Sequence, residues 1–450
     1  MINFRSALHV AISRHELKPY VYSYPSKRSY KELNDINLVD IWDPENTGDV
    51  SLYIHIPFCH YRCTYCTLFL TTRYTEDLKQ LYVNKICEQL KFYLPYAGNR
   101  RVSSIYFGGG TPTVLSMEQF DQIFQTIRNV FRKVPESAEV CVETSPDTVS
   151  PELLDKLKTL GVNRISMGIQ TMDPAELKAS GRPYSIETTI SAIKMIKEKF
   201  DNLNLDLIYG LSGQDCESWA KSLKYIIQQR PMTISLYPVV SRPLTAIEKQ
   251  KNIYSDRYLD DAKKLEIYDE NIKYLKAEGY RQESFTRFTR LPKEASAYEQ
   301  EVLDFQGVPM IGIGAGARSN NGKYHYSFDY AVSLKKVGEA INDFIELEFS
   351  ASTIAQFGAI LGEEGERLRY FLLSLTVDKL SSSYYRDSFQ RDLFVDFREV
   401  ISALVDEGCI TISSDKSIRL TEKGYKYSNL AAHLLFSDHV KTLEERYIPQ

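Results

Sequence analysis

The sequence has little that would tie it to a membrane or to nucleic acid. It contains no uninterrupted apolar run of about 18 residues, the length that a membrane-spanning helix needs. Its 55 Lys and Arg nearly balance its 59 Asp and Glu, and the net charge of -4 gives no general attraction to nucleic acid. Residues 1–15 carry charges among their apolar side chains and lack the apolar centre of a signal peptide. These absences predict a cytoplasmic protein with no transmembrane segment and no nucleic-acid partner.

Cysteine is also scarce, and its seven residues are unevenly spread. An odd number in a chain of 450 residues does not suggest a disulfide framework. Four cysteines stand alone and are expected to be small buried side chains: Cys87, Cys141, Cys216 and Cys409. The other three, Cys59, Cys63 and Cys66, fall within eight residues, directly after the strand-like apolar segment 51–56.

Three thiolates in one loop at the end of a strand indicate an iron-sulfur cluster. In a four-iron cluster they leave one iron without a protein ligand, and an open metal position invites a cofactor or substrate. The alternative is a structural zinc site, which would need four ligands. The sequence has no second cysteine pair, so only His55 or His60 could complete such a site locally. The pattern favours the cluster, with Cys59, Cys63 and Cys66 as its ligands.

Strand-like segments alternate with amphipathic segments along the first half of the chain. The expected strands are residues 51–56, 103–107, 139–143, 164–169, 203–208 and 233–238. Amphipathic helices are expected between them, for example at residues 78–93, 117–131 and 188–199. This alternation predicts an α/β architecture with parallel strands. Six strand–helix units indicate a partial (β/α)6 barrel, with its chemistry at the carboxyl ends of the strands.

The cysteine spacing resembles that of radical S-adenosylmethionine (SAM) enzymes. Three and then two residues separate Cys59, Cys63 and Cys66, and the aromatic Tyr65 stands just before the last. In that superfamily the open iron of a [4Fe-4S] cluster is chelated by the amino and carboxylate groups of SAM. An electron from the cluster then cleaves SAM to methionine and a 5'-deoxyadenosyl radical. The resemblance implies both cofactors here, and an external electron donor such as flavodoxin or ferredoxin.

Glycine and polar residues occur at the predicted strand ends. Residues 108–112 read Gly-Gly-Gly-Thr-Pro, where three glycines let the backbone approach a ligand and expose N–H groups to it. Further polar residues end or closely follow the next strands: Glu143, Gln170, Arg182 and Asp206. Each by itself could be a helix cap or a surface group. Their common position favours contacts with the ribose, carboxylate and sulfonium groups of SAM.

Four motifs are similar to oxygen-independent coproporphyrinogen III oxidase, and the similarity spans about residues 20–436. They are Tyr-Ile-His-Ile-Pro-Phe-Cys at 53–59, Tyr-Phe-Gly-Gly-Gly-Thr-Pro-Thr at 106–113, Gly-Val-Asn-Arg-Ile-Ser-Met-Gly-Ile-Gln at 161–170 and Asp-Leu-Ile-Tyr-Gly-Leu at 206–211. Members of this family bind two SAM molecules. Matching positions imply contacts with the first or shared SAM sites for Tyr53, Tyr65, Gly109, Glu143, Gln170, Arg182 and Asp206. Gly110 and Thr111 would lie beside the second SAM.

Other segments depart from the porphyrin oxidase. Its cluster motif has a fourth Cys where this chain has Leu68, which speaks against coproporphyrinogen decarboxylation. Residues 235–245, 312–319 and 325–331 look like those of class C radical SAM methylases, which methylate sp2 carbons in thiazoles, indoles and quinones. In that setting Arg318 would meet the carboxylate of a second SAM or an anionic substrate.

These resemblances lead to a hypothesis and two alternatives. The hypothesis is a radical SAM C-methyltransferase that uses two SAM molecules to methylate an sp2 carbon of an aromatic substrate, with menaquinone at C8 as the specific expectation. A lipid quinone would bring the protein peripherally to the inner membrane. One alternative is an anaerobic porphyrin or haem enzyme, either a haem-opening methylase or a coproporphyrinogen III dehydrogenase. The other is a non-catalytic haem chaperone, which would bind haem without consuming SAM.

Domain organisation is expected to follow the chain in four segments. Residues 1–50 form a Tyr-rich extension on the barrel, in which Tyr20, Tyr22 and Tyr24 alternate as in a strand. Residues 51–240 form the radical SAM barrel, and residues 241–349 extend it with the region for the second SAM and the substrate. Residues 350–450 resemble the family's small helical, winged-helix-like domain and are expected to cover the barrel.

Overall fold

The computed structural model describes residues 4–33, 36–240, 246–292, 298–328 and 333–447. The chain forms two compact units. The first, called here the helical unit, comprises Met1–Ser29, Asp260–Gly307 and Leu361–Tyr447. The second, called the barrel unit, comprises Tyr30–Leu259 and Val308–Ile360. Each unit therefore collects segments that are far apart in the sequence, and the four consecutive domains expected above stay a prediction.

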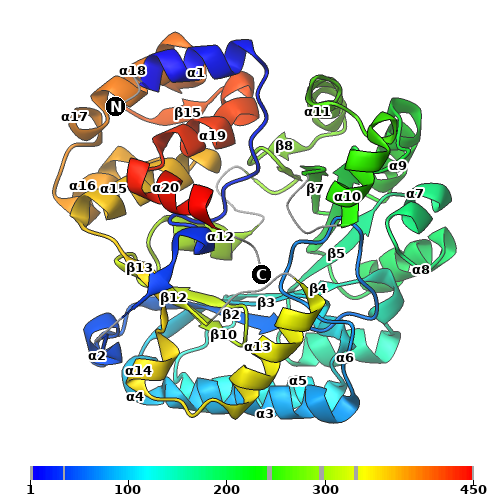
Figure 1. The fold of residues 1–450 in the computed structure, drawn as a ribbon, viewed down its shortest axis with the longest axis vertical. Coiled ribbons are helices and arrows are strands. Elements are labelled where there is room, and N and C mark those ends of the chain that lie inside the picture. The colour runs from blue at the N-terminus through cyan, green and yellow to red at the C-terminus, as the bar shows by residue number, and fades with distance from the viewer. Residues whose placement is uncertain (1–3, 34–35, 241–245, 293–297, 329–332, 448–450) are drawn as a thin grey trace. The chain divides into compact units, whose positions relative to one another are not determined.

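The core of the barrel unit is a large, mostly parallel sheet (Figure 1). Its central strands neighbour one another in chain order and pair in parallel: β2 (Asp49–Ile56), β3 (Arg101–Gly109), β4 (Glu139–Thr144), β5 (Arg164–Gln170), β6 (Leu203–Tyr209) and β7 (Thr233–Pro238). Each begins and ends within two residues of a strand predicted from the sequence. Nearly every position of β3 is buried, as expected for a parallel strand covered on both faces. The predicted α/β fold is confirmed.

One edge of this sheet is extended by strands that the sequence did not predict. β10 (Met310–Ile313) pairs in parallel with β2. The sheet then continues antiparallel through β11 (Arg318–Asn320), β12 (Tyr324–Ser327), β13 (Phe357–Ile360) and β1 (Lys31–Glu32). Gly312 permits the close approach of β10 and β11, because a Cβ there would overlap the backbone carbonyl of Arg318.

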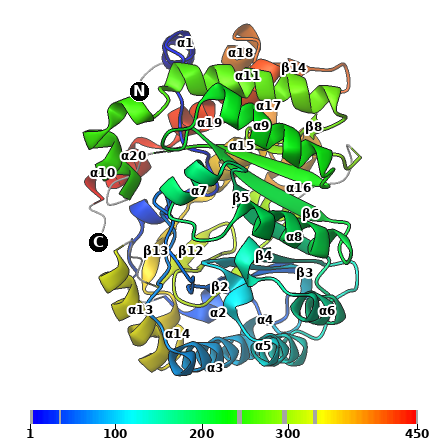
Figure 2. The same cartoon turned by 90° about the vertical axis from the view of Figure 1, so that its right-hand side faces the viewer.

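Helices connect the strands of the barrel unit and pack on its sheet (Figure 2). The longer ones are α3 (Glu76–Phe92), α5 (Met117–Val130), α6 (Pro151–Thr159), α8 (Ile186–Lys197), α9 (Cys216–Gln228) and α13 (Leu334–Glu346). The shorter ones are α2 (Leu38–Ile41), α4 (Leu94–Ala97), α7 (Pro174–Ala179), α10 (Ala246–Ile253) and α14 (Ala351–Ile354). Helix α5 begins with a capping box between Ser116 and Gln119. Its Phe120 and Phe124 pack on Phe107 of β3, with ring centroids 5.7 and 5.2 Å away, and burial of this face stabilises the helix.

The helical unit is built around two buried apolar clusters. Its helices are α1 (Phe4–Ser13), α11 (Asp261–Ala277), α12 (Glu299–Phe305), α15 (Glu363–Thr376), α16 (Ser382–Phe389), α17 (Leu393–Asp396), α18 (Arg398–Asp406), α19 (Glu422–Leu435) and α20 (Asp438–Arg446). Two antiparallel hairpins accompany them: β8 (Arg281–Gln282) with β9 (Arg287–Thr289), and β14 (Ile410–Ile412) with β15 (Ile418–Leu420). The β14–β15 hairpin directly precedes α19, in agreement with the winged-helix-like domain predicted for this region.

The strand predicted from alternating tyrosines near residue 22 is wrong. Residues 16–23 have no regular secondary structure. The Val21 N–H donates instead to the Asn429 side-chain oxygen of α19, at 2.8 Å. This backbone donor therefore has a hydrogen-bond acceptor without a neighbouring strand. Tyr24 is buried against Phe436, with ring centroids 5.1 Å apart, whereas Tyr20 is 40% exposed.

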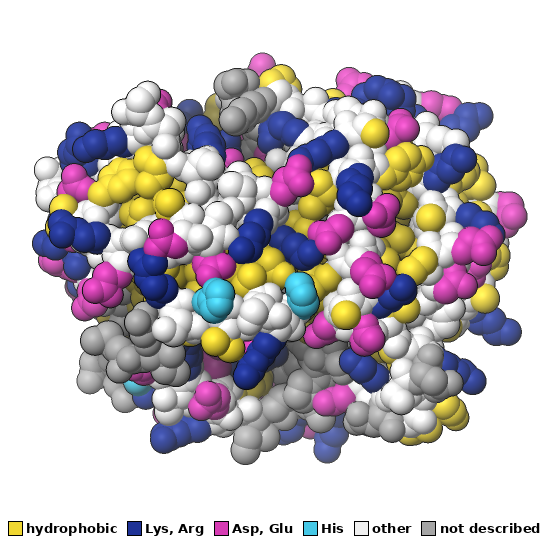
Figure 3. All heavy atoms as spheres, turned by 90° about the horizontal axis from the view of Figure 1, so that it is seen from above, with side chains coloured by type: hydrophobic (Ala, Val, Ile, Leu, Met, Phe, Trp, Pro, Cys, Tyr) yellow, Lys and Arg dark blue, Asp and Glu magenta, His cyan; other side chains and the backbone are white. Residues whose placement is uncertain are grey.

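No helix among the described residues is long and apolar enough to cross a bilayer. On the face shown in Figure 3, Lys and Arg side chains are interspersed with Asp and Glu side chains. Such mixing follows from the nearly balanced charge of the chain and gives only a weak long-range field.

Candidate functional site

The three clustered cysteines lie in the loop that follows β2. This loop is fastened to the barrel unit by its backbone. The Cys59 N–H donates to the Thr71 carbonyl at 3.1 Å, and the Thr64 N–H donates to the Ser180 carbonyl at 3.1 Å. Cys66 N–H closes a turn onto the Cys63 carbonyl at 3.1 Å. The thiols are therefore carried by an ordered loop at the carboxyl end of a parallel strand, where the sequence predicted the chemistry to be.

The three thiols influence one another. Burial raises the pKa of Cys59 to about 12 and that of Cys66 to about 11. The negative charges of the neighbouring thiolates raise the pKa of Cys59 further, as Cys63 does for Cys66. Cys59 is buried, and Cys63 and Cys66 are partly buried. Thiolates held this close together repel one another, and coordinated iron supplies the compensating positive charge. The loop therefore fits an iron-sulfur cluster.

The histidines that could complete a zinc site are engaged elsewhere. His55 lies between the Tyr53 hydroxyl, 3.2 Å from Nδ1, and the Phe69 carbonyl, 2.8 Å from Nε2. His60 Nδ1 is 3.2 Å from an Asp147 carboxylate oxygen. A tetrahedral zinc ion needs its ligand atoms about 2.0–2.3 Å from one common point. Within the described part of the chain, no group of three or more His, Cys, Asp and Glu side chains is arranged to hold a single ion.

The glycine segment at the end of β3 packs directly on this loop. Gly109 has φ +111°, and a Cβ there would lie 2.5 Å from the His55 ring. A Cβ on Gly110 would lie 2.6 Å from the Phe58 carbonyl oxygen. Both positions therefore require glycine. Thr111 places its hydroxyl 3.2 Å from the Cys59 Sγ atom, which brings the glycine segment beside the cysteine loop.

The N–H groups of this segment are used within the protein, contrary to the expectation that they are exposed to a ligand. The Gly109 N–H donates to Glu143 Oε2 at 3.1 Å. Those of Gly110 and Thr111 donate to the carbonyls of Ile56 and Phe58, at 2.7 and 2.8 Å.

Two stacked tyrosines lead to a buried carboxyl group. Tyr53 and Tyr106 occupy paired positions on β2 and β3, and their rings stack with centroids 6.0 Å apart. The Tyr106 hydroxyl donates to Glu143 Oε1 at 2.7 Å. Burial raises the pKa of Glu143 to about 7, while the Tyr106 hydrogen bond opposes the rise and the charge of Asp206 adds to it. Glu143 can thus change its protonation near neutral pH.

Asp206 on β6 belongs to a chain of polar side chains across three strands. Asn204 donates to one of its carboxylate oxygens at 2.8 Å, and Ser166 donates to the other at 3.4 Å. Ser235 in turn donates to the Asn204 amide oxygen at 2.9 Å. Burial raises the pKa of Asp206, and these hydrogen bonds restrain the rise. The two carboxyl groups therefore have different donors: the Tyr106 hydroxyl and the Gly109 N–H for Glu143, the Asn204 amide and the Ser166 hydroxyl for Asp206.

Arg182 joins the end of β5 to the cysteine loop. Its Nη1 donates to the Gly168 carbonyl at 2.7 Å and also contacts the Tyr184 hydroxyl, while its Nε donates to the Tyr65 hydroxyl at 3.2 Å. Tyr65 directly precedes Cys66, so the Arg182 guanidinium holds the cysteine loop in place and also adds a positive charge beside it. Gln170 ends β5 with φ +74°, a rare value outside glycine.

Arg318 lies on β11, with only β10 between that strand and β2: Gly312 of β10 pairs with Tyr53, and a Cβ on Gly312 would lie 2.2 Å from the Arg318 carbonyl oxygen. Its contact with a second SAM or with an anionic substrate stays a prediction. Tyr106 and Asn204, which donate to Glu143 and Asp206, were not among the site residues predicted from the sequence. Both could have been found from strand register, because Tyr106 pairs with Tyr53 and Asn204 stands two residues before Asp206 on one face of β6.

Comparison with known proteins agrees with this geometry. Residues 53–226 match the Radical SAM superfamily. The chain is 27% identical over 398 residues to the oxygen-independent coproporphyrinogen III oxidase of Escherichia coli K12, covering 83% of this chain and 82% of that protein. It is 26% identical over 383 residues to the heme chaperone HemW of Bacillus subtilis, covering 84% of this chain and 97% of the relative.

Among solved structures, coproporphyrinogen III oxidase from Escherichia coli has the same fold. The TM-score is 0.77 at 24% sequence identity, and the match covers 95% of this chain and 98% of that one. Membership of a radical SAM domain implies a [4Fe-4S] cluster and SAM as cofactors, and the cysteine loop fits the first of these. The chain therefore contains a Radical SAM domain and is related along most of its length to oxygen-independent coproporphyrinogen III oxidases and heme chaperones.

Proposed function

We propose that this protein is a radical SAM enzyme that acts on a tetrapyrrole. The observation that carries the proposal is similarity over more than four fifths of the chain to a coproporphyrinogen III oxidase and to a heme chaperone. Coproporphyrinogen and haem are both tetrapyrroles. These relatives support the porphyrin alternative better than methylation of menaquinone, which neither relative's name supports.

Cys59, Cys63 and Cys66 would hold the [4Fe-4S] cluster in the loop after β2. When bound, the reduced cluster supplies the electron for the reductive cleavage of SAM, which is the source of the radical chemistry. Arg182 would keep the loop in place through Tyr65, next to Cys66. Thr111, 3.2 Å from the Cys59 sulfur, marks the side of the loop that the glycine segment covers. External reduction, by a flavodoxin or ferredoxin, is part of the proposal.

The carboxyl groups would position SAM. Glu143 and Asp206 can accept hydrogen bonds from ribose hydroxyls or the SAM amine, and each favours a cationic sulfonium nearby. A cation near Glu143 lowers the pKa of its carboxyl from about 7, so that SAM binding below neutral pH releases a proton. The stacked rings of Tyr53 and Tyr106 would exclude water from one side of this site.

A second SAM belongs to the proposal as well. Gly110 and Thr111 would lie beside it, and the Arg318 guanidinium would bind its carboxylate or a substrate carboxylate. Leu68 occupies the position of the oxidase's fourth cysteine and is 49% exposed. This change distinguishes the chain from the oxidase at the cluster itself, so we do not assign it oxidative decarboxylation of coproporphyrinogen.

The decisive experiment is anaerobic reconstitution followed by product analysis. The protein, with its cluster, would receive SAM and a reductant together with haem, coproporphyrinogen III or menaquinone in separate reactions. Mass spectrometry would then measure 5'-deoxyadenosine, S-adenosylhomocysteine and modified substrate. A modified tetrapyrrole formed together with 5'-deoxyadenosine supports the proposal. Methylated menaquinone with S-adenosylhomocysteine would refute it in favour of the quinone methyltransferase, and haem binding without SAM consumption would refute it in favour of a carrier.

A matched pair of cysteine variants controls for the cluster. Cys63→Ala should lose the brown absorbance and all SAM cleavage. Cys216→Ala, which changes an exposed cysteine on α9 of the same unit, should keep both.

A further inference from the structure

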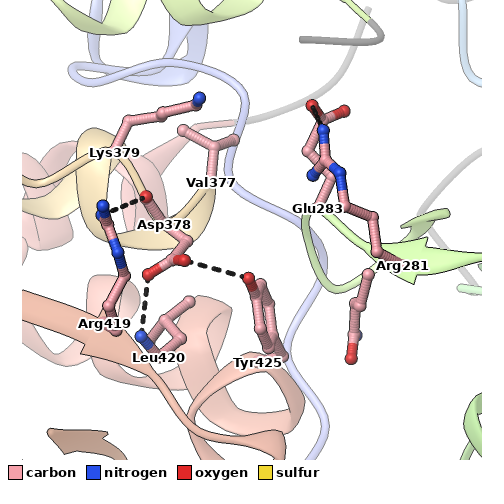
Figure 4. A pocket seen from close by; sticks show the side chains of 9 residues that line it. Arg281, Glu283, Val377, Asp378, Lys379, Arg419, Leu420 and Tyr425 are labelled. Atoms are coloured by element: carbon pink, nitrogen blue, oxygen red, sulfur yellow. Dashed lines mark hydrogen bonds and ion pairs between the residues drawn. The ribbon is translucent and has the colours of Figure 1, made fainter. Parts of the chain in front are cut away.

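The helical unit contains a cavity that shares no residue with the site described above. Its volume is about 550 Å³, within the range of small-molecule sites. Charged and aromatic side chains line it: Arg281, Glu283, Asp378, Lys379, Arg419 and Tyr425 (Figure 4). They come from β8, from the end of α15, from β15 and from the start of α19.

Both acidic side chains of this cavity have donors within the protein. Asp378 accepts the Leu420 N–H at 2.7 Å and the Tyr425 hydroxyl at 3.1 Å. Glu283 accepts a hydrogen bond from Arg287 Nε at 2.7 Å. Burial raises the pKa of Tyr425, which keeps its hydroxyl protonated as the donor to Asp378. The carboxylates are thus used to hold the wall of the cavity together.

The basic side chains are used differently. Within the described residues, the Lys379 ammonium has no carboxylate partner. Arg419 reaches backbone carbonyls, with Nη1 3.5 Å from the Asp378 oxygen and 3.4 Å from that of Ile418. Arg281 donates to the carbonyls of Leu291 and Pro292 at 2.9 and 2.8 Å. Among the described residues, Lys379 and Arg419 are therefore the two cations of this cavity without a carboxylate partner, and Arg419 is exposed to solvent.

The backbone fixes where these cations stand. Two residues after the end of α15 at Thr376, Asp378 has a left-handed φ of +53°, and the Lys379 N–H donates to the Ser374 carbonyl at 2.9 Å. The side chain of Asp378 ties this turn to β15, the strand that carries Arg419. Both cations are consequently attached to one hydrogen-bonded corner rather than to separate loops, which fixes the spacing of their backbones.

Apolar surface also lines the cavity, beside Asp378. Val377 and Leu420 line the cavity together with the Tyr425 ring. We infer that this cavity binds a small organic dicarboxylate, with one carboxylate on the Arg419 guanidinium, the other on the Lys379 ammonium and an apolar spacer against Val377 and Leu420. The planar fork of an arginine suits a carboxylate, and an ammonium binds a second one as a point charge.

The test is calorimetric titration of the full-length protein with chosen probes. Succinate and glutarate carry two carboxylates on an apolar spacer, succinamide has the same shape without charge, and inorganic phosphate has charge without a spacer. We expect saturable binding of succinate or glutarate, weakened by added salt, and neither saturable binding of succinamide nor equally tight binding of phosphate.

Single charge removals localise the site. Lys379→Met and Arg419→Gln should each weaken dicarboxylate binding about tenfold or more, because each removes a charge-assisted hydrogen bond. Lys273→Met and Arg446→Gln remove the same charges from the helical unit outside the cavity, and they should leave binding unchanged. Circular dichroism would establish that all four variants are folded. Absence of dicarboxylate binding, equal binding of phosphate, or binding that survives both cavity variants would overturn the inference.

Discussion

Glu143 makes the stability of the barrel unit depend on pH in a defined direction. Its pKa is raised from an ordinary value near 4.5 to about 7, chiefly by burial. Below about pH 4.5 the carboxyl is protonated in both the folded and the unfolded chain, and its contribution to stability is fully present. Between pH 4.5 and pH 7 the folded chain holds a proton that the unfolded chain has lost, so the free energy of unfolding falls as pH rises. At about 1.4 kcal/mol per pH unit, the total fall is about 3 kcal/mol.

Tryptophan fluorescence can measure the free energy of unfolding of the barrel unit. The chain has two Trp, and both, Trp42 and Trp219, are buried in the barrel unit. Urea unfolding would be followed by this signal from pH 4.5 to pH 8.5 for the wild type and for Glu143→Gln, which cannot ionise. Subtracting the two curves removes the titration of every other group that the substitution leaves unchanged. The difference between the two free energies of unfolding should change by about 3 kcal/mol between pH 4.5 and pH 7 and stay constant at higher pH.

Two further variants test separately how the Tyr106 hydrogen bond and the Asp206 charge shift the pKa of Glu143. Tyr106→Phe removes a hydrogen bond that stabilises the charged carboxylate, so the pKa of Glu143 rises and the fall in stability extends above pH 7. Asp206→Asn removes a repelling charge, so the pKa of Glu143 drops. The pH range over which the free energy of unfolding falls then becomes narrower. Glu198→Gln, at an exposed position, serves as the control. A wild-type curve parallel to that of Glu143→Gln throughout would refute the reasoning.

Three other expectations concern the cluster loop and the glycine segment. Cys66→Ser should lose most of the iron measured after reconstitution, whereas Cys409→Ser, in the helical unit, should keep it. Arg182→Lys should weaken SAM binding about tenfold in anaerobic equilibrium dialysis, because the single ammonium nitrogen replaces two separate guanidinium nitrogens, Nε on Tyr65 and Nη1 on Gly168; unchanged affinity would remove Arg182 from the site. Gly109→Ala should cost about 1–3 kcal/mol in the same fluorescence assay, since φ is +111° and the His55 ring fills the space, and a loss below about 0.5 kcal/mol would show that the strand end can adjust.

The parallel core could be predicted because its signals are local. Buried parallel strands appear as short apolar segments, and the polar or glycine residues at their carboxyl ends mark the reaction side. This pattern singled out Glu143 on β4 and Asp206 on β6, two strands separated only by β5, and the charge of Asp206 does raise the pKa of Glu143. The cysteine loop was equally local, since its three thiols occur within eight residues.

What the sequence did not reveal depends on partners distant in the chain. β10 has only four residues and runs into the glycines that follow it, so its strand character comes from pairing with β2 some 260 residues earlier. Near residue 22, the Asn429 side chain of α19 accepts a backbone hydrogen bond where alternating tyrosines predicted a strand. The hydrogen bond from the Gly109 N–H to Glu143 could not be predicted either. A sequence motif shows which donors and acceptors are present, but not which of them already bond to one another in the fold.

The discontinuity of the helical unit has a consequence for how the protein is made. The apolar face of α1, with Leu8, Ala11 and Ile12, is buried by residues of α18 and α19, and His9 bonds to Glu407 across 398 positions of sequence. At ribosomal speeds of about 5–20 residues per second, α1 therefore waits on the order of 20 to 80 s for its partners. During that time the barrel strands can already pair, while the apolar face of α1 stays exposed to solvent. Chaperones that bind nascent chains would have to cover this face to prevent aggregation.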